Sequence, residues 1–265
     1  MRALLSQGLA TLGLDASRAE TLERFSARLL EKNQVMNLTA ITSPDAVAQL
    51  HLLDSAALTK FVDLSGKQVV DVGTGAGFPG MPLRILKDDF DLTLLDSLGK
   101  RVNWLSEVCD ELQLKRVQCV HARAEEFAAQ HREEYDLAVS RAVAQLNVLS
   151  ELCLPLVKVG GQFLAMKSVD TEEEIAAAKS AIKALGGRIA CVEDYTIPTS
   201  SIVHRVVIIE KTAPTPRVRK DQKVSVVIPK GGSACHRSSP WCPVRAAPEK
   251  LHSPRSPAWR SRASA

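Results

Sequence analysis

The sequence predicts an α/β fold, with a Rossmann-like, mostly parallel seven-stranded sheet covered by helices on both faces. Three observations predict it. From residue 68 onward, short apolar runs alternate with helical patterns, which is typical of parallel strands joined by crossover helices. The first apolar run leads into a glycine-rich turn at 71–80. The last two strand patterns follow one another without a helix, so we expect them to pair antiparallel.

A helical segment precedes the sheet. Apolar residues recur with helical spacing over about 2–12, 17–32 and 44–60. Ser43 and Pro44 suit the N-cap and first position of the third helix. We therefore expect residues 1–60 to form an N-terminal helical segment that packs on the core.

Strands and helices then alternate to residue 211. The expected strands are 68–72, 91–96, 116–121, 135–140, 160–168, 188–196 and 202–211. The expected helices are 80–87, 99–113, 124–131, 145–157 and 171–185. We assign these elements to one domain over residues 61–212.

Charge is divided unevenly along the 265 residues, whose net charge is +4. Residues 1–211 hold 23 Lys and Arg against 28 Asp and Glu, a balance of −5, whereas residues 212–265 hold 11 against 2, a balance of +9. Residues 213–265 are rich in Pro, Ser and Arg, and this composition predicts a disordered basic tail. The mildly acidic main part gives no bulk-charge argument for a nucleic-acid partner.

Several protein classes are disfavoured by composition. No apolar stretch is long enough to span a membrane, and the N-terminus lacks the apolar core of a signal peptide. The six cysteines form no C-x-x-C pair and no metal-ligand spacing, which suits reduced thiols. We expect a cytoplasmic protein without a membrane partner or a bound metal.

The loop at 71–80, DVGTGAGFPG, is the most informative motif. Gly73, Gly75 and Gly77 allow positive φ and let a ligand approach the backbone. The loop lacks the Gly-Lys-Ser/Thr of a phosphate-binding P-loop, although 75–80 fits G-x-G-x-x-G and leaves a dinucleotide open. Asp71 at the strand end would repel a pyrophosphate and favour the ammonium and sulfonium of S-adenosylmethionine (SAM).

Further candidate cofactor residues follow the second and third strands. Asp96 ends the second strand about twenty residues beyond the loop, where a carboxylate binds ribose hydroxyls; capping the next helix is the alternative, and both roles are compatible. Ala124 and Glu125 follow the third strand, where a small residue gives an adenine ring space and Glu125 reaches its polar edge. A seven-stranded sheet ending in an antiparallel hairpin is the architecture of most SAM-dependent methyltransferases.

The segment after the fourth strand, 140–144, would face the methyl group. It has no Asn/Asp-Pro-Pro-aromatic motif, no Cys nucleophile, and no His or Glu to act as a general base. Methylation of guanine N7 needs neither a base nor a nucleophile, because that nitrogen has a free lone pair. Arg141 is the candidate catalytic residue: it orients the base through O6 and N7, or binds the cofactor carboxylate. A plain salt bridge is the alternative role.

Positively charged residues are expected around the same edge of the sheet. Lys100 and Arg101 begin a helix, where cations oppose the helix dipole and an outside anion such as an RNA phosphate would favour them. Arg123 and Lys167 end other strands at this edge. Together with Arg141 they predict a basic rim that binds RNA, although each residue alone is typical of a solvated surface.

These motifs resemble the RsmG (GidB) family, the bacterial 16S rRNA guanine-N7 methyltransferases, from about residue 33 to 211. The resemblance rests on blocks that occur in family order: Asn33-x3-Asn37-Leu38-Thr39-x-Ile41, His51-x2-Asp54-Ser55, the glycine loop, Leu94 to Ser97 with Lys100-Arg101, Arg123 to Glu125, 140–144 and Lys167.

The resemblance implies a cytoplasmic SAM-dependent methyltransferase whose substrate is a guanine in the decoding-centre loop of 16S rRNA in the small ribosomal subunit. It implies cofactor contacts at Gly73, Phe78, Ala124, Glu125 and Arg141, and an RNA-facing set of Lys100, Arg101, Arg123, Lys167 and Arg205. We expect a monomer. Two alternatives are a non-catalytic RNA-binding or ribosome-assembly protein that retains the pocket, and an NAD(P)-dependent reductase.

The chain departs from the family at its C-terminal end. Family members usually end in a Pro-Arg-x-x-Gly-x-Pro basic segment, whereas residues 216–220 begin similarly and then diverge. This departure concerns RNA contacts near the end of the chain and leaves the pocket unaffected.

Overall fold

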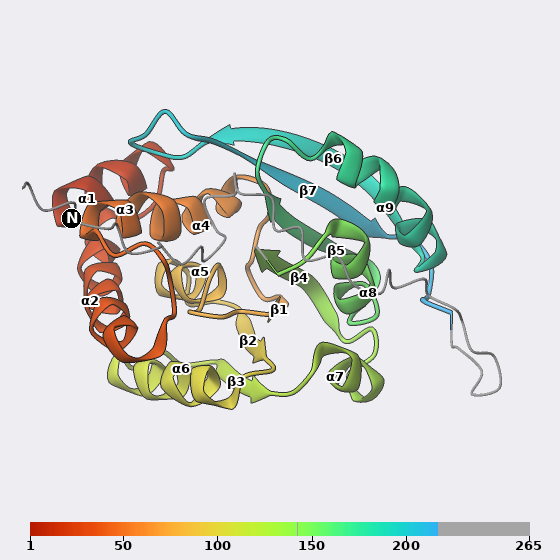
Figure 1. Cartoon of the computed structure of the whole chain (residues 1–265), viewed down its shortest axis with the longest axis horizontal. Coiled ribbons are helices and arrows are strands. Elements are labelled where there is room, and N and C mark those ends of the chain that lie inside the picture. Colours follow the sequence, from red (N-terminus) through yellow and green to blue (C-terminus); the bar gives the residue numbers. More distant parts are fainter. Residues whose placement is uncertain (142, 217–265) are drawn as a thin grey trace, which may run out of the picture.

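The computed structural model describes residues 1–141 and 143–216, and it contains the predicted sheet (Figure 1). Its strands are β1 (Gln68–Val72), β2 (Asp91–Asp96), β3 (Val117–His121), β4 (Tyr135–Arg141), β5 (Val157–Lys167), β6 (Gly187–Thr196) and β7 (Val203–Lys211). Its longer helices are α1 (Arg2–Thr11), α2 (Ala19–Met36), α5 (Gly80–Leu86), α6 (Gly99–Glu111), α7 (Ala124–Gln130), α8 (Leu146–Cys153) and α9 (Glu172–Ala184). The predicted tail lies outside the described residues, except for 213–216.

The strand order is β3-β2-β1-β4-β5-β7-β6. Strands β1 to β5 pair in parallel, whereas β7 is antiparallel to both β5 and β6, which confirms the predicted hairpin. The order reverses between β1 and β4, which are direct neighbours. In an open α/β sheet, the carboxyl ends of strands on either side of such a switch point border the ligand crevice. The glycine loop follows β1 and Arg141 ends β4, so both lie at this point.

Two layers of helices cover the sheet (Figure 1). Val69 and Val70 are both fully buried, and because neighbouring residues of a strand point to opposite faces, they enter different cores. The N-terminal helices share one core with α5 and α6, through side chains such as Phe25 and Trp104. Helices α7, α8 and α9 form the other core. The N-terminal segment therefore packs against the sheet directly.

The predicted helix over 44–60 is divided into shorter pieces. They are α3 (Pro44–Val47), the π-helical η2 (Ala48–Leu53), α4 (Asp54–Ala56) and the 3₁₀ helix η3 (Ala57–Lys60). A π-helical turn is wider than an α-turn and frequently marks a functional site. Here it contains His51, and the carbonyl of Leu50 accepts a hydrogen bond from Arg141. The spacing of apolar residues does not distinguish these helix types, so the sequence predicted one continuous helix over 44–60.

Most other predicted boundaries agree with the structure within three residues. Two helix ends differ by four residues: the helix predicted over 17–32 continues to Met36, and the helix predicted over 145–157 ends at Cys153. Pro155 follows, and because proline has no amide hydrogen it cannot continue the helical hydrogen bonds; β5 then begins at Val157. Within the described residues, no helix is long and apolar enough to cross a membrane.

Candidate active site

The glycine loop is a tight turn held by its own backbone and by the end of β2. Gly73, Gly75 and Gly77 have φ values of +70°, +59° and +91°, the left-handed region that favours glycine. A Cβ at position 75 would meet just one atom within 4 Å, the carbonyl oxygen of Gly73 at 3.9 Å, so the backbone there has open space beside it. Such an accessible backbone suits the approach of a ligand.

Asp71 lies fully buried beneath this loop. Its Oδ2 accepts hydrogen bonds from the Thr74 hydroxyl and the Gly80 amide, both at 2.8 Å. Its Oδ1 has no hydrogen-bond partner among the described residues. Burial raises the pKa of Asp71 to about 7, and the two hydrogen bonds oppose that rise. Asp71 thus holds the loop through Oδ2, and Oδ1 remains a hydrogen-bond acceptor without a partner among the described residues.

Asp96 joins the end of β2 to the same loop. Its Oδ2 accepts from the Gly75 amide at 2.8 Å, and its Oδ1 accepts from the Leu98 amide at 2.9 Å. The second bond closes the turn that leads into α6, and Arg101 Nη1 lies 3.9 Å from Oδ2. The N-cap of α6 is Leu98 and no side chain caps this helix, so the alternative role of Asp96 as a helix cap is wrong; Asp96 instead closes the turn before it. Its contact with a ribose stays a prediction.

The residues after β3 lie at the same edge of the sheet, because β3 pairs in parallel with β2 and His121 is level with Asp96. Ala124 begins α7 and is half-buried, whereas Glu125 is exposed and pairs with Arg123 at 3.0 Å. The pKa of Glu125 is lowered, mainly by a hydrogen bond from its own backbone amide and also by the bond from Arg123. Its carboxylate is thus held in the acceptor form that the predicted adenine contact requires.

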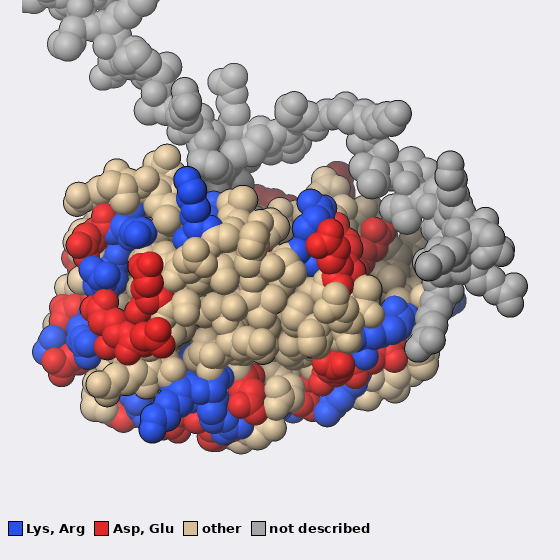
Figure 2. Space-filling view, turned by 90° about the horizontal axis from the view of Figure 1, so that it is seen from below, with Lys and Arg blue, Asp and Glu red and all other residues tan. Residues whose placement is uncertain are grey.

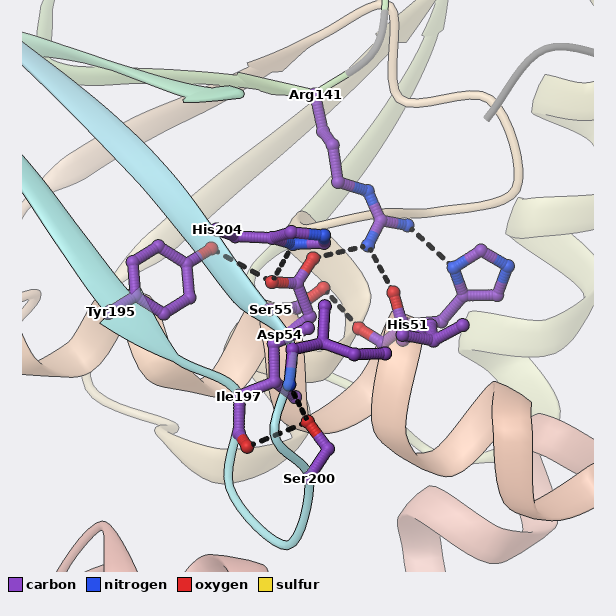
Figure 3. Close-up of polar contacts among 10 residues, drawn as sticks. His51, Asp54, Ser55, Arg141, Tyr195, Ile197, Ser200 and His204 are labelled. Atoms are coloured by element: carbon purple, nitrogen blue, oxygen red, sulfur yellow. Dashed lines mark hydrogen bonds and ion pairs between the residues drawn. The ribbon is translucent and has the colours of Figure 1, made fainter. Parts of the chain in front are cut away.

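Arg141 ends β4 and is held by the N-terminal segment (Figure 3). Its Nη1 donates to the carbonyl of Leu50 and to Oδ2 of Asp54, both at 3.2 Å. Its guanidinium lies 4.7 Å from the centre of the Phe78 ring, a cation–π contact. Burial lowers the pKa of Arg141, while Asp54 opposes that change. The predicted catalytic residue is thereby joined to the glycine loop through Phe78.

His51 completes the contact between Arg141 and Phe78. Its Nδ1 lies 3.2 Å from Arg141 Nη2, and its ring stacks on Phe78 with 4.6 Å between centroids. Because a guanidinium only donates, Nδ1 must accept, which places the ring proton on Nε2, 2.7 Å from the Thr39 hydroxyl. Burial first, and then the Arg141 charge, holds the pKa of His51 well below its usual value. The imidazole is therefore neutral.

Asp54 connects Arg141 to the C-terminal hairpin. Its side chain is fully buried, and its Oδ1 accepts from the Tyr195 hydroxyl and from His204 Nδ1, both at 2.8 Å (Figure 3). Burial, followed by the Asp54 charge, raises the pKa of Tyr195 well above its usual value. We call the five residues His51, Asp54, Arg141, Tyr195 and His204 the Arg141 cluster.

The expectation that no histidine lies at this corner is wrong. The residues after β4 hold none, but His51 and His204 reach the corner from elements 90 residues before and 63 residues after Arg141 in the sequence. The motif His51-x2-Asp54-Ser55 was visible in the sequence, but nothing in it indicated a contact with Arg141. Phe78 lies at 4% exposure, mainly within the core, so its cofactor contact stays a prediction.

The five predicted RNA-facing residues fall into two groups. Lys100, Arg101 and Arg123 are exposed or partly exposed near the ends of β2 and β3. Lys167 and Arg205 are level on β5 and β7 and are mostly buried. Lys167 Nζ donates to Glu174 at 2.5 Å and to the Ala144 carbonyl at 2.7 Å, so its charge is neutralised within the chain.

Arg205 is similarly engaged, because it pairs with Asp194 and with Glu172, each at 2.6 Å. On the face in Figure 2, blue and red side chains likewise lie intermixed, around an uncharged centre. On this face positive side chains are thus interspersed with negative ones, and RNA contacts by Lys100 and its neighbours stay a prediction. Among the residues with assigned positions, no group of three His, Cys, Asp or Glu is arranged to hold a metal ion.

Comparison with known proteins shows the family. Residues 18–203 match the model of the GidB family, described as rRNA small subunit methyltransferase G. The chain belongs to this family. It is 50% identical over 207 residues to the ribosomal RNA small subunit methyltransferase G of Clostridium botulinum (strain ATCC 19397 / Type A), a match that covers 77% of this chain and 87% of that protein. With the Alkaliphilus metalliredigens protein of the same name, identity is 47% over 218 residues, covering 80% of this chain and 91% of the other.

Solved structures show the same fold. The crystal structure of NSun6 from Pyrococcus horikoshii with SFG superposes with a TM-score of 0.50 at 12% identity, covering 62% of this chain and 52% of that one. This likeness concerns the sheet and its helices. The predicted Rossmann-like fold and the resemblance to the RsmG (GidB) family are both confirmed.

Proposed function

We propose that this protein transfers a methyl group from SAM to N7 of a guanine in the decoding-centre loop of 16S rRNA. Family membership carries the general statement: the protein is a SAM-dependent rRNA methyltransferase. It also favours methyl transfer over the nicotinamide-dependent alternative. The position of the methylated atom and the roles of individual residues are our proposal, supported by the geometry at the switch point between β1 and β4.

The residues at the switch point suit SAM. The open backbone at Gly75 offers space for a ligand, and the unpartnered Oδ1 of the fully buried Asp71 offers an acceptor for a cationic one. Gly73, Gly77 and Phe78 would hold the cofactor from the loop. Asp96 would hold its ribose, and Ala124 with Glu125 its adenine.

The proposed chemistry needs positioning and electrostatics. Bound SAM supplies an electrophilic methyl group, and N7 of guanine attacks it with a lone pair without losing a proton. A general base is therefore unnecessary, which suits a corner where His51 and Asp54 are both occupied by Arg141. Arg141 orients the base or the cofactor carboxylate, and the protein gains rate by holding the reactants in line.

RNA would approach from the edge formed by Lys100, Arg101 and Arg123. Lys100 is exposed at the start of α6, close to Asp96 and the glycine loop. Phosphate contacts of this kind orient a nucleic acid without reading its sequence. We expect the protein to act as a cytoplasmic monomer on rRNA or on the small ribosomal subunit.

The test supplies labelled SAM with small ribosomal subunits or with naked rRNA, followed by reduction and aniline cleavage, which locate N7-methylguanine. The expected result is label at one guanine N7 of 16S rRNA. Label found only on an exocyclic amine would contradict the N7 assignment. SAM binding measured by calorimetry without any turnover would instead favour the RNA-binding alternative.

A further inference from the structure

A buried carboxylate lies behind Arg141, at a position to which no role has been assigned. Asp54 is fully buried, and both of its oxygens are used: Oδ2 by Arg141, and Oδ1 by Tyr195 and His204. A desolvated carboxylate is costly unless such partners compensate it. The three partners come from β4, β6 and β7, whereas Asp54 begins α4. One side chain therefore joins the N-terminal segment, the switch point and the hairpin.

The Arg141 guanidinium is held from several directions. Asp54 and the Leu50 carbonyl accept from Nη1, His51 accepts from Nη2, and Phe78 lies against its face. Asp54 is the partner that supplies a full negative charge in direct contact, so it contributes the strongest of these interactions. Removal of that charge would take away the carboxylate that the buried guanidinium contacts at 3.2 Å.

The N-terminal sequence motif extends this arrangement. The side-chain oxygen of Asn33, Oδ1, accepts hydrogen bonds from the backbone amides of Leu38 and Thr39. Its side-chain nitrogen, Nδ2, donates to the backbone carbonyl of Thr39. Thr39 in turn lies 2.7 Å from Nε2 of His51. The motif that begins at Asn33 thus fixes the hydroxyl that orients the imidazole facing Arg141.

A purely structural role explains this arrangement poorly. Apolar side chains of similar volume usually stabilise a core as well as a buried ion pair does. Here the ionic cluster lies at the switch point, and the chain after Arg141 lies against the loop, since a Cβ on Gly73 would stand 2.5 Å from a Val143 methyl carbon. A displacement of Arg141 would therefore disturb both sides of the proposed pocket.

We propose that Asp54 is a positioning residue for methyl transfer: it holds Arg141 in its working orientation and is itself held by Tyr195 and His204. This inference rests on the proposed function and adds residues far from the pocket in sequence. His51, fixed through Thr39, supports the other side of the guanidinium.

The test is the substitution Asp54→Asn in the full-length protein. Two donors face Oδ1, so the asparagine oxygen takes that side and its NH₂ faces the Arg141 donors, which breaks one contact while keeping the volume. We expect kcat/KM for small-subunit methylation to fall on the order of 100-fold, the cost of a misplaced group in a catalytic site. The matched control is Asp91→Asn, which removes a carboxylate paired with Arg116 at the opposite end of β2 and should keep wild-type kinetics.

Non-additivity separates positioning from folding. If Asp54 acts through Arg141, the double variant Asp54→Asn/Arg141→Met should be no slower than Arg141→Met alone. The inference would be overturned if the double variant were slower than Arg141→Met by the factor that Asp54→Asn alone causes. Wild-type kinetics in Asp54→Asn would overturn it as well. If Asp54→Asn does not fold, Tyr195→Phe removes a single donor and should show a smaller loss with the same non-additivity; additive losses there overturn the inference equally. A wild-type protein that methylates no rRNA would refute the proposed function instead.

Discussion

The glycine loop and the Arg141 cluster lie side by side at the switch point, but they are built differently. In the loop, the contacts of Asp71 join residues at most nine positions apart. In the Arg141 cluster, Asp54 contacts residues 87, 141 and 150 positions away. The loop is thus held by near neighbours and by the end of the adjacent strand β2, 21 residues away, whereas the cluster exists only after the sheet has formed and the N-terminal helices have packed on it.

This difference indicates how each region should fail. A substitution in the loop acts on backbone conformation and local space. A substitution in the Arg141 cluster leaves a charge without its partner in a buried place, and its effect should spread to three separate parts of the chain. The following experiments compare the two regions.

The largest expected effect is that of Arg141→Met. It leaves the Asp54 carboxylate buried without its cation, which should lower the free energy of unfolding by about 3–5 kcal/mol and slow methyl transfer further than Asp54→Asn does. Urea unfolding measures the first effect. Arg116→Met, which breaks the partly exposed pair with Asp91, is the control and should cost about 1 kcal/mol or less. Equal losses in the two variants would mean that the cluster is no more than a surface ion pair.

In the loop, Gly77→Ala should have the next largest effect. The new Cβ would stand 2.6 Å from Met81 Cγ and 2.9 Å from Leu105 Cδ2, at a φ of +91°. Strain and overpacking together should cost about 2–4 kcal/mol and weaken SAM binding. Gly160→Ala has a similar φ, +88°, with no atom within 4 Å, so thermal unfolding should show about 1–2 kcal/mol from backbone strain alone. A Gly77→Ala variant that binds SAM normally would contradict the proposed cradle.

The carboxylate beneath the loop gives a pH-dependent effect. Since burial raises the pKa of Asp71 to about 7 from an ordinary value of 3.8, the folded state keeps a proton that the unfolded state has lost between those values. Stability should therefore fall as pH rises through this window, by up to about 1.4 kcal/mol per pH unit, and level off above pH 7. Asp71→Asn should lack this component in urea unfolding between pH 5 and 8. If the free energy of unfolding depended on pH in the same way in the wild type and in Asp71→Asn, the contribution of Asp71 would be refuted.

The smallest expected effect concerns Lys100, at the surface beside both regions. Lys100→Ala should weaken binding to 16S rRNA by about 1 kcal/mol or less and make the salt dependence shallower, because one phosphate contact is lost. Lys115→Ala, an exposed lysine beyond the other end of α6, is the matched control. Filter binding across a salt series measures both. An equal effect of the two changes would remove Lys100 from the proposed RNA-binding edge.

Much of the fold was predictable because its patterns are local. The ranges of β1 and β2 were predicted without error, since apolar runs between turn residues leave little choice of boundary. The π-helical turn at Ala48–Leu53 was missed, because its wider geometry is tied to a contact with Arg141, far along the chain. Lys167 and Arg205 were predicted to face RNA, but their carboxylate partners Glu174, Asp194 and Glu172 come from elements whose positions the sequence did not reveal.

The amino-acid sequence by itself determined the alternation of strands and helices, the glycine turn after β1 and the family to which the chain belongs. These depend on residues that are neighbours in the chain, where periodicity and backbone freedom act directly. Tertiary structure alone decided that His51, Asp54, Tyr195 and His204 surround Arg141, and that His51 is neutral. Burial and charge pairing depend on distances across the folded molecule, and spacing along the sequence does not contain them.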